Sequence, residues 1–155
     1  MKFSVWLVLI AGMLACSIVL ATDPPSSARQ QIQTQLNAML SAANAHDTDA
    51  FMTPLVHESS LLFIFNGEVF RGWNALHEQQ LKWWQHGKAK ATYKTNGPDE
   101  FLTLGTDSVV TTSSYISSRP LANGTTSTGS FVVTYIWKHL PVGWRIVYGH
   151  ESWAR

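Results

Sequence analysis

The sequence predicts an α+β domain in which N-terminal helices pack against one antiparallel sheet. Two observations support this class. Apolar residues recur at helical spacing in the first part of the chain. From Lys88 onward, the pattern changes to strands separated by turns. Helices segregated to one side of an antiparallel sheet are typical of α+β proteins. A length of 155 residues indicates a single domain.

Composition excludes several classes of protein. The formal net charge is +1, from 11 Lys+Arg and 10 Asp+Glu, so we expect no nucleic-acid partner. The hydrophobic fraction of 45% argues against disorder. A single cysteine excludes an intrachain disulfide framework. The 7 Trp, 7 Phe and 4 Tyr predict an aromatic core or an aromatic-lined pocket.

The N-terminus resembles a secretory signal peptide. Lys2 precedes an apolar run from Val5 to Leu20, and Val19-Leu20-Ala21 fits a small-residue cleavage rule. We expect residues 1–21 to be the signal peptide, 22–27 a linker and 28–155 the domain. The mature protein would then be secreted or periplasmic, without membrane attachment. Two alternatives stay open: a retained membrane anchor, and a lipoprotein attached at Cys16.

Three helices are expected. The first begins after Ser26 or Ser27, ends near residues 44–46 and carries an apolar stripe of Ile32, Leu36, Met39, Leu40 and Ala43. Asp47 is the predicted N-cap of a short second helix, whose buried side comprises Phe51, Met52 and Leu55. The third runs from about Trp73 to His86, with Gly87 as its C-cap. Its inner side consists of Leu76, Gln80, Trp83 and Trp84.

The strands are expected at 61–65, 68–70, 90–95, 101–104, 108–115, 131–139 and 144–153. Asn66-Gly67 joins the first two, and this dipeptide between β-favouring runs is a strong hairpin signal. We expect residues 117–128 to form a loop, because they contain Pro120, Asn123 and Gly124.

Three segments resemble the SnoaL-like branch of the nuclear-transport-factor-two-like superfamily. They are Gly143-Trp144-Arg145-Ile146-Val147-Tyr148-Gly149-His150-Glu151-Ser152, Asn44-Ala45-His46-Asp47-Thr48-Asp49-Ala50-Phe51, and Phe70-Arg71-Gly72 before a helix. The resemblance spans roughly residues 28–154. It implies a cystatin-like cone, in which a strongly curved sheet wraps around a long helix and leaves a pocket. Members include ketosteroid isomerase, scytalone dehydratase and polyketide cyclases, and also a non-enzymatic kinase association domain.

Alternation in the last strand predicts which residues face this pocket. A period of two places Trp144, Ile146, Tyr148, His150 and Ser152 on one face. His150 is then the candidate general base, because a neutral imidazole accepts a proton near pH 7. Ser152 could orient it or donate to a ligand. The alternative is that His150 only ties the terminal strand to its neighbours.

Aromatic residues complete the predicted site. Tyr115 and Tyr135 are candidate hydrogen-bond donors to a developing oxyanion, a role that the resemblance to ketosteroid isomerase implies. Trp83 and Trp84 are candidate ligand-stacking residues, although core or interface packing is the favoured explanation for them. Glu58 and Glu78 are the carboxylates retained as possible pocket acids, so the isomerase's carboxylate pattern is not evident. No zinc-ligand spacing or cofactor-binding motif occurs, and we expect neither metal nor cofactor.

Three functions fit these features. The first is an exported pocket protein that binds a small, largely apolar ligand. The second is a small cofactor-independent isomerase, dehydratase or cyclase that uses His150 as base. The third is an oligomerisation module. The long strands near the C-terminus carry apolar residues on both faces, with Val132 and Ile136 opposite Val133 and Tyr135. We therefore expect a homodimer formed through the outer face of the sheet.

Overall fold

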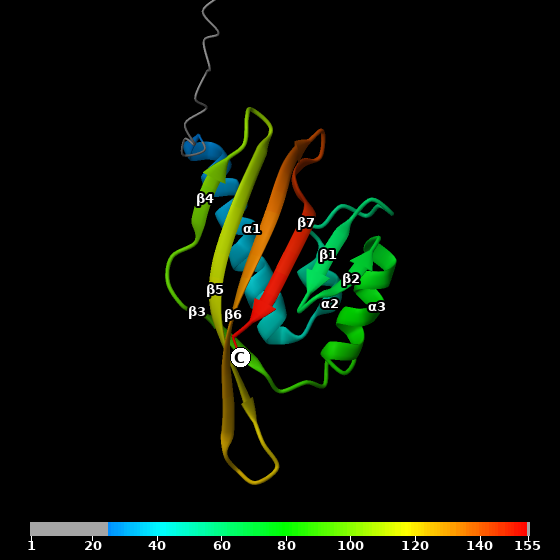
Figure 1. Cartoon of the computed structure of the whole chain (residues 1–155), viewed down its shortest axis with the longest axis vertical. Coiled ribbons are helices and arrows are strands. Elements are labelled where there is room, and N and C mark those ends of the chain that lie inside the picture. The colour runs from blue at the N-terminus through cyan, green and yellow to red at the C-terminus, as the bar shows by residue number, and fades with distance from the viewer. Residues whose placement is uncertain (1–24, 155) are drawn as a thin grey trace, which may run out of the picture.

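A computed structural model describes residues 25–154, which form helices and a curled sheet (Figure 1). The helices are α1 (Ser26–Ala45), α2 (Thr48–Met52) and α3 (Trp73–Trp83). The strands are β1 (Leu62–Phe65), β2 (Glu68–Arg71), β3 (Thr92–Thr95), β4 (Glu100–Thr103), β5 (Ser108–Pro120), β6 (Thr126–Leu140) and β7 (Gly143–Trp153). The expected signal peptide and Cys16 lie outside the described residues. Within residues 25–154, no helix is long and apolar enough to span a membrane.

The seven strands form one sheet in the order β2-β1-β7-β6-β5-β3, and β4 also pairs with β5. One pairing differs from the expected antiparallel sheet, because β1 runs parallel to β7, with Leu62 opposite Tyr148. The Asn-Gly turn specifies only the β1–β2 hairpin. Which strand flanks β1 on its other side depends on the path of the preceding segment. That segment forms a parallel bridge between Leu55 and Ile146 and so enters alongside β7.

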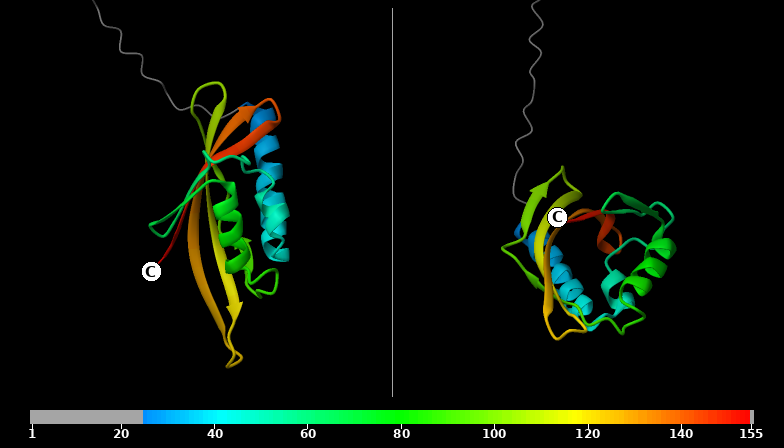
Figure 2. Two further views of the ribbon diagram at one scale, coloured as in Figure 1. Left: turned by 90° about the vertical axis from the view of Figure 1, so that its right-hand side faces the viewer. Right: turned by 60° about the horizontal axis from the view of Figure 1, so that its bottom comes forward.

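Helix α1 packs against the inner face of the sheet, and the sheet curls around it (Figure 2). The predicted stripe on this helix is confirmed for Ile32, Leu36, Met39 and Ala43, which are buried, while Leu40 is partly buried against the same core. The opposing side of the core contains the fully buried Trp137, whose indole Nε1 donates to Thr111 Oγ1 at 2.9 Å. The hydrogen bond pairs two buried polar groups that face the apolar side of α1.

The prediction that residues 117–128 form a loop is wrong for most of this segment, because the two strands extend into it. Strands β5 and β6 pair from Ser108–Lys138 as far as Pro120–Thr126. Residues 117–129 therefore form a hairpin arm, which pairs with β3 at Ser117 and Ser118 and projects beyond the rest of the sheet from there (Figure 1). The arm is mostly Ser, Thr and Gly, which gave no apolar alternation in the sequence. Backbone hydrogen bonds between β5 and β6 form its ladder.

Two helix boundaries also differ from expectation. Helix α1 begins at Ser26 with Pro25 before it and without a side-chain cap, so the helix includes the end of the expected linker. Helix α3 ends at Trp83 rather than His86. The chain then turns through left-handed conformations at Gln85, His86 and Gly87, which are incompatible with a continuing right-handed helix.

Candidate functional site

A β-bulge in β7 determines which of its side chains face inward. Trp137 lies opposite Ile146, whereas the adjacent Ile136 lies opposite Tyr148, so Val147 is an extra residue in the ladder. One inserted residue exchanges the two faces of the strand beyond it. Ile146 therefore points into the core before the bulge, and Glu151 lies on the inner side after it.

The bulge places His150 and Ser152 on the outer face, where both are exposed. His150 lies between Thr134 of β6 and Ile64 of β1. The expectation that these two side chains face the interior is wrong, because strict alternation from Trp144 does not survive the extra residue. Neither side chain reaches the inner cavity described next.

The inner side of the sheet and the helices enclose a cavity of about 230 Å³. Nine of its sixteen lining residues are aromatic. Four residues that the sequence singled out, Trp83, Trp84, Tyr115 and Tyr135, are among them. The others are Leu36, Met39, Leu40, Ala43, Phe51, Phe65, Gln80, Tyr93, Phe131, Val133, Glu151 and Trp153. An apolar cavity with few polar groups is typical of small-molecule sites.

Glu151 supplies the carboxyl group of this cavity. The indole Nε1 of Trp153 donates to Glu151 Oε1 at 2.8 Å. Although the residue keeps some exposure at the open side, burial of its carboxyl group raises the pKa to about 7, which the Trp153 hydrogen bond opposes only in part. None of the lining residues is Lys, Arg or His. The carboxyl group therefore has no cationic partner in the cavity wall.

Three phenols accompany the carboxyl group. Burial raises the pKa of Tyr93, Tyr115 and Tyr135, and the negative charge of Glu151 raises each pKa further. These phenols consequently stay protonated at neutral pH and can donate hydrogen bonds. Trp84 Nε1 donates to the Tyr93 hydroxyl at 3.2 Å. One proton-accepting group and several phenolic donors thus converge on one apolar space.

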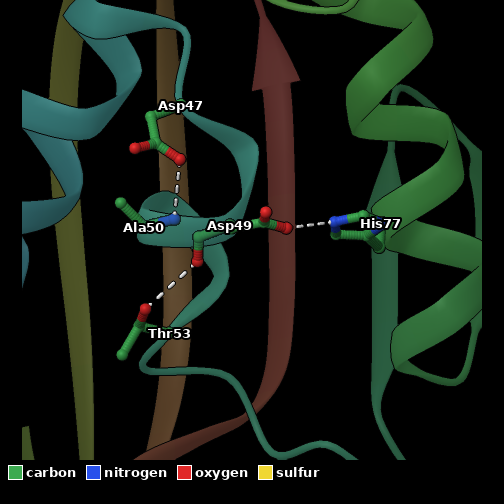
Figure 3. Close-up of polar contacts among 5 residues, drawn as sticks. All are labelled: Asp47, Asp49, Ala50, Thr53 and His77. Atoms are coloured by element: carbon green, nitrogen blue, oxygen red, sulfur yellow. Dashed lines mark hydrogen bonds and ion pairs between the residues drawn. The ribbon is translucent and has the colours of Figure 1, made fainter.

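A polar contact joins α2 and α3 on the helical side of the cavity. Asp47 caps α2 by accepting from the Ala50 N–H at 3.0 Å, as the sequence predicts. Asp49 of α2 lies 2.7 Å from His77 Nε2 of α3 (Figure 3). These two helices present Phe51 and Trp83 to the cavity, so the contact links the elements that carry two of its aromatic residues.

Sequence reasoning missed Glu151, Tyr93 and Trp153 as site residues. The carboxylates that it retained, Glu58 and Glu78, are exposed and do not line the cavity. A usable signal was Gly149, because a glycine inside a strand often marks a bulge or a close backbone approach. The described residues contain no group of three or more His, Cys, Asp and Glu side chains that could hold a metal ion.

Comparisons with known proteins agree with this architecture. No protein-family model matches the sequence, and no curated protein matches it. A nuclear transport factor 2-like superfamily protein from Salmonella enterica aligns with a TM-score of 0.72 and 24% identity, over 84% of this chain and 93% of that one. An NTF-2-like protein of unknown function from Shewanella oneidensis aligns with a TM-score of 0.67 and 23% identity, over 80% and 98%.

A third solved structure, from Streptomyces avermitilis, belongs to a protein of the NTF2-like family that its name proposes to be a dehydratase. It aligns with a TM-score of 0.69 and 14% identity, over 84% of this chain and 98% of that one. These identities are low, and what the three structures share with this chain is the arrangement of helices and curled sheet. The chain therefore has the fold of the nuclear-transport-factor-two-like superfamily.

Proposed function

We propose that this protein binds a small, largely apolar organic molecule in the aromatic cavity, with Glu151 orienting the ligand. The observation that carries the proposal is the desolvated carboxyl group of Glu151 in a wall made mostly of aromatic rings. A carboxyl group buried without a charged partner costs stability. A ligand that offers a polar group to it would offset that cost while its apolar part fills the cavity.

Binding can be measured with 1-aminoanthracene, a neutral aromatic probe whose fluorescence rises in apolar surroundings. We expect saturable binding that Ala43→Phe weakens by about tenfold or more, because Ala43 lines the cavity from α1 and a phenyl ring would occupy the space. His150→Ala is the matched control and should bind the probe normally, since His150 is exposed on the other face. Thermal melting establishes that both variants fold, and Leu40→Phe provides a second cavity-filling variant.

Absence of probe binding to the folded, unmodified protein would overturn the proposal. Equal binding by Ala43→Phe and the unmodified protein would also count against it, because the probe would then occupy another site.

A second candidate function is acid–base catalysis by an isomerase, dehydratase or cyclase. The specific observation is a carboxyl group with a pKa of about 7 beside the phenols of Tyr115 and Tyr135. A base works best when its pKa lies near the working pH. In this proposal Glu151, rather than His150, removes a proton next to a carbonyl, and a phenol donates to the oxygen that becomes negative.

The catalytic proposal can be tested by deuterium exchange of 2-tetralone in D₂O, followed by NMR. Glu151→Gln should slow protein-catalysed exchange by about 10²–10⁴. His150→Ala should leave it unchanged. A protein that binds 2-tetralone without accelerating exchange would be a binding protein and not a catalyst of this class.

Export belongs to the same proposal. We propose cleavage after Ala21, which would release a secreted or periplasmic protein. N-terminal sequencing of protein isolated from its source should then begin at Thr22. A lipidated Cys16 at the N-terminus would instead identify a membrane-tethered lipoprotein.

A further inference from the structure

We propose that the natural ligand of this cavity is an organic cation, namely a hydrophobic amine whose ammonium group pairs with Glu151 while the aromatic walls enclose its apolar part. This inference rests on the proposed binding function and adds the chemical class of the ligand. It follows from the charge of the cavity, from its aromatic lining and from the hydrogen bonding of Glu151.

The charged side chain that lines the cavity is acidic. Its wall contains one carboxyl group and no Lys, Arg or His. The titratable groups that the neighbouring strands direct toward Glu151 are Tyr135 of β6, Tyr115 of β5 and Tyr93 of β3, all neutral when protonated. The residues that α1, α2 and α3 contribute to the lining carry no charge. Within residues 25–154 the cavity wall thus offers no cation to the carboxylate, and we infer that the positive group comes from the ligand.

Among the described residues, His46 and Arg119 are basic and lie near the wall without lining the cavity. His46 packs edge-on behind Trp84, with ring centroids 5.8 Å apart, and against Tyr93 at 6.5 Å. The charge of Arg119 acts on Tyr93. Neither residue lines the cavity, so neither supplies an ion pair to Glu151.

The aromatic lining complements the same ligand. Phe65 and Trp83 lie 4.6 Å apart, and Phe131 and Trp153 also lie 4.6 Å apart, as centroid distances. Aromatic rings attract ammonium groups through their quadrupole, most strongly where water is excluded. An anionic ligand would meet both the carboxylate and the negative faces of rings. The lining therefore discriminates by charge as well as by shape.

The Glu151 carboxylate has remaining capacity to accept hydrogen bonds from a ligand. Its Oε1 accepts from Trp153 within the same strand, and a carboxylate can accept several further hydrogen bonds. An ammonium group offers three donors and would also favour the ionised carboxylate. A neutral ketone or ester offers only acceptors, so it could form a hydrogen bond with Glu151 only when the acid is protonated. Hydrogen bonding to Glu151 consequently has opposite pH dependence for the two ligand classes.

Three probes of nearly equal shape separate these classes: 1-naphthylmethylamine, 1-naphthylmethanol and 1-naphthoate, titrated into the full mature chain by calorimetry at pH 8. We expect the amine to bind about tenfold or more tightly than the alcohol and the naphthoate to bind most weakly. If the alcohol or the naphthoate binds as tightly as the amine, the cation proposal is wrong while the binding function stands. If none of the three binds, the binding function fails as well.

Two further measurements tie the preference to Glu151. Glu151→Gln should reduce the amine's affinity to about that of the alcohol. Glu78→Gln, which removes an exposed carboxylate of α3, is the matched control and should change neither. An amine preference that survives Glu151→Gln would place the cation elsewhere and overturn the proposal.

The unmodified protein provides a test that does not depend on the variant folding. Because the carboxylate is the form that binds the ammonium group, the amine's affinity should rise by up to about 30-fold between pH 5.5 and pH 8. The alcohol's affinity should change little. An amine affinity that is flat, or that falls over this range, would contradict the proposal.

Discussion

At the level of single residues, the carboxyl group of Glu151 makes folding stability depend on pH. Burial raises its pKa from 4.5 to about 7, so the folded chain holds this proton at pH values where the unfolded chain has released it. The contribution of Glu151 to stability is therefore full below about pH 4.5 and is lost as the pH rises to about 7. The difference corresponds to about 3 kcal/mol.

This pH dependence predicts the behaviour of Glu151→Gln. The variant should be more stable than the unmodified protein at pH 8 and of similar stability at pH 4.5, because glutamine never ionises. Thermal melts of both proteins over this range measure the difference. A parallel pH profile for the two proteins would show that the carboxyl group is not desolvated.

Gly149 is required by a close approach between neighbouring strands. It lies opposite Phe63 of β1 and Tyr135 of β6. A Cβ atom at this position would clash with the Phe63 ring and lie 3.2 Å from the ring of Tyr135. We expect Gly149→Ala to cost about 1–3 kcal/mol by overpacking, as a lower midpoint in urea.

The double variant Gly149→Ala, Phe63→Leu should recover part of this loss, because a smaller residue opposite position 149 makes room for the methyl group. Ser152→Ala, on the exposed face of the same strand, serves as the control and should change stability little. An unchanged urea midpoint for Gly149→Ala would refute the tight packing.

At the level of secondary-structure elements, Asn44 joins the end of α1 to strand β3. Its Nδ2 donates to the Tyr93 carbonyl at 2.9 Å, and its Oδ1 accepts from the Tyr93 N–H at 2.8 Å. This pair of hydrogen bonds imitates a neighbouring strand. It holds Tyr93, a cavity residue, beside the helix.

Asn44→Ala should therefore destabilise the protein by about 1 kcal/mol and increase hydrogen exchange at the Tyr93 amide. Asn37→Ala is the control on the same helix. The Asn37 side chain accepts a hydrogen bond from Gln33, so its loss should leave the Tyr93 amide protected. Unaltered exchange at Tyr93 in Asn44→Ala would show that β3 is held by β5 alone.

At the level of the whole molecule, an apolar row crosses the outer face of the sheet. Direct cross-strand pairs join Leu102 to Val110, Val110 to Ile136, and Ile136 to Tyr148, and Leu62 of β1 continues the row. Leu102 is 40% exposed, and Val132 on the same face is 41% exposed. A contiguous apolar surface of this kind is a candidate protein interface.

We predict that two copies of the chain pair through this row. Light scattering at micromolar concentration should give twice the mass of the chain, and Ile136→Lys should give the monomer mass, because a charge in an apolar interface is costly. Ser127→Lys, on the exposed hairpin arm, should stay dimeric. A monomer mass for the unmodified protein would exclude this assembly.

Much of the architecture could be predicted from local patterns. The apolar stripe from Ile32 to Ala43 places α1 against the core, and Asn66-Gly67 places the first hairpin. Trp83, Trp84, Tyr115 and Tyr135 were also selected from sequence, and all four line the cavity. Such features depend on residues close together in the chain or on large aromatic side chains that must be buried.

The sequence by itself determined the elements, their order and the aromatic character of the interior. The tertiary structure decided that β1 runs parallel to β7 and that Glu151, rather than His150, faces the cavity. The physical reason is that alternation specifies a strand's faces only while its ladder is regular. The extra residue at Val147 arises from pairing with β6, and this long-range pairing is not encoded in the local pattern around His150 and Glu151.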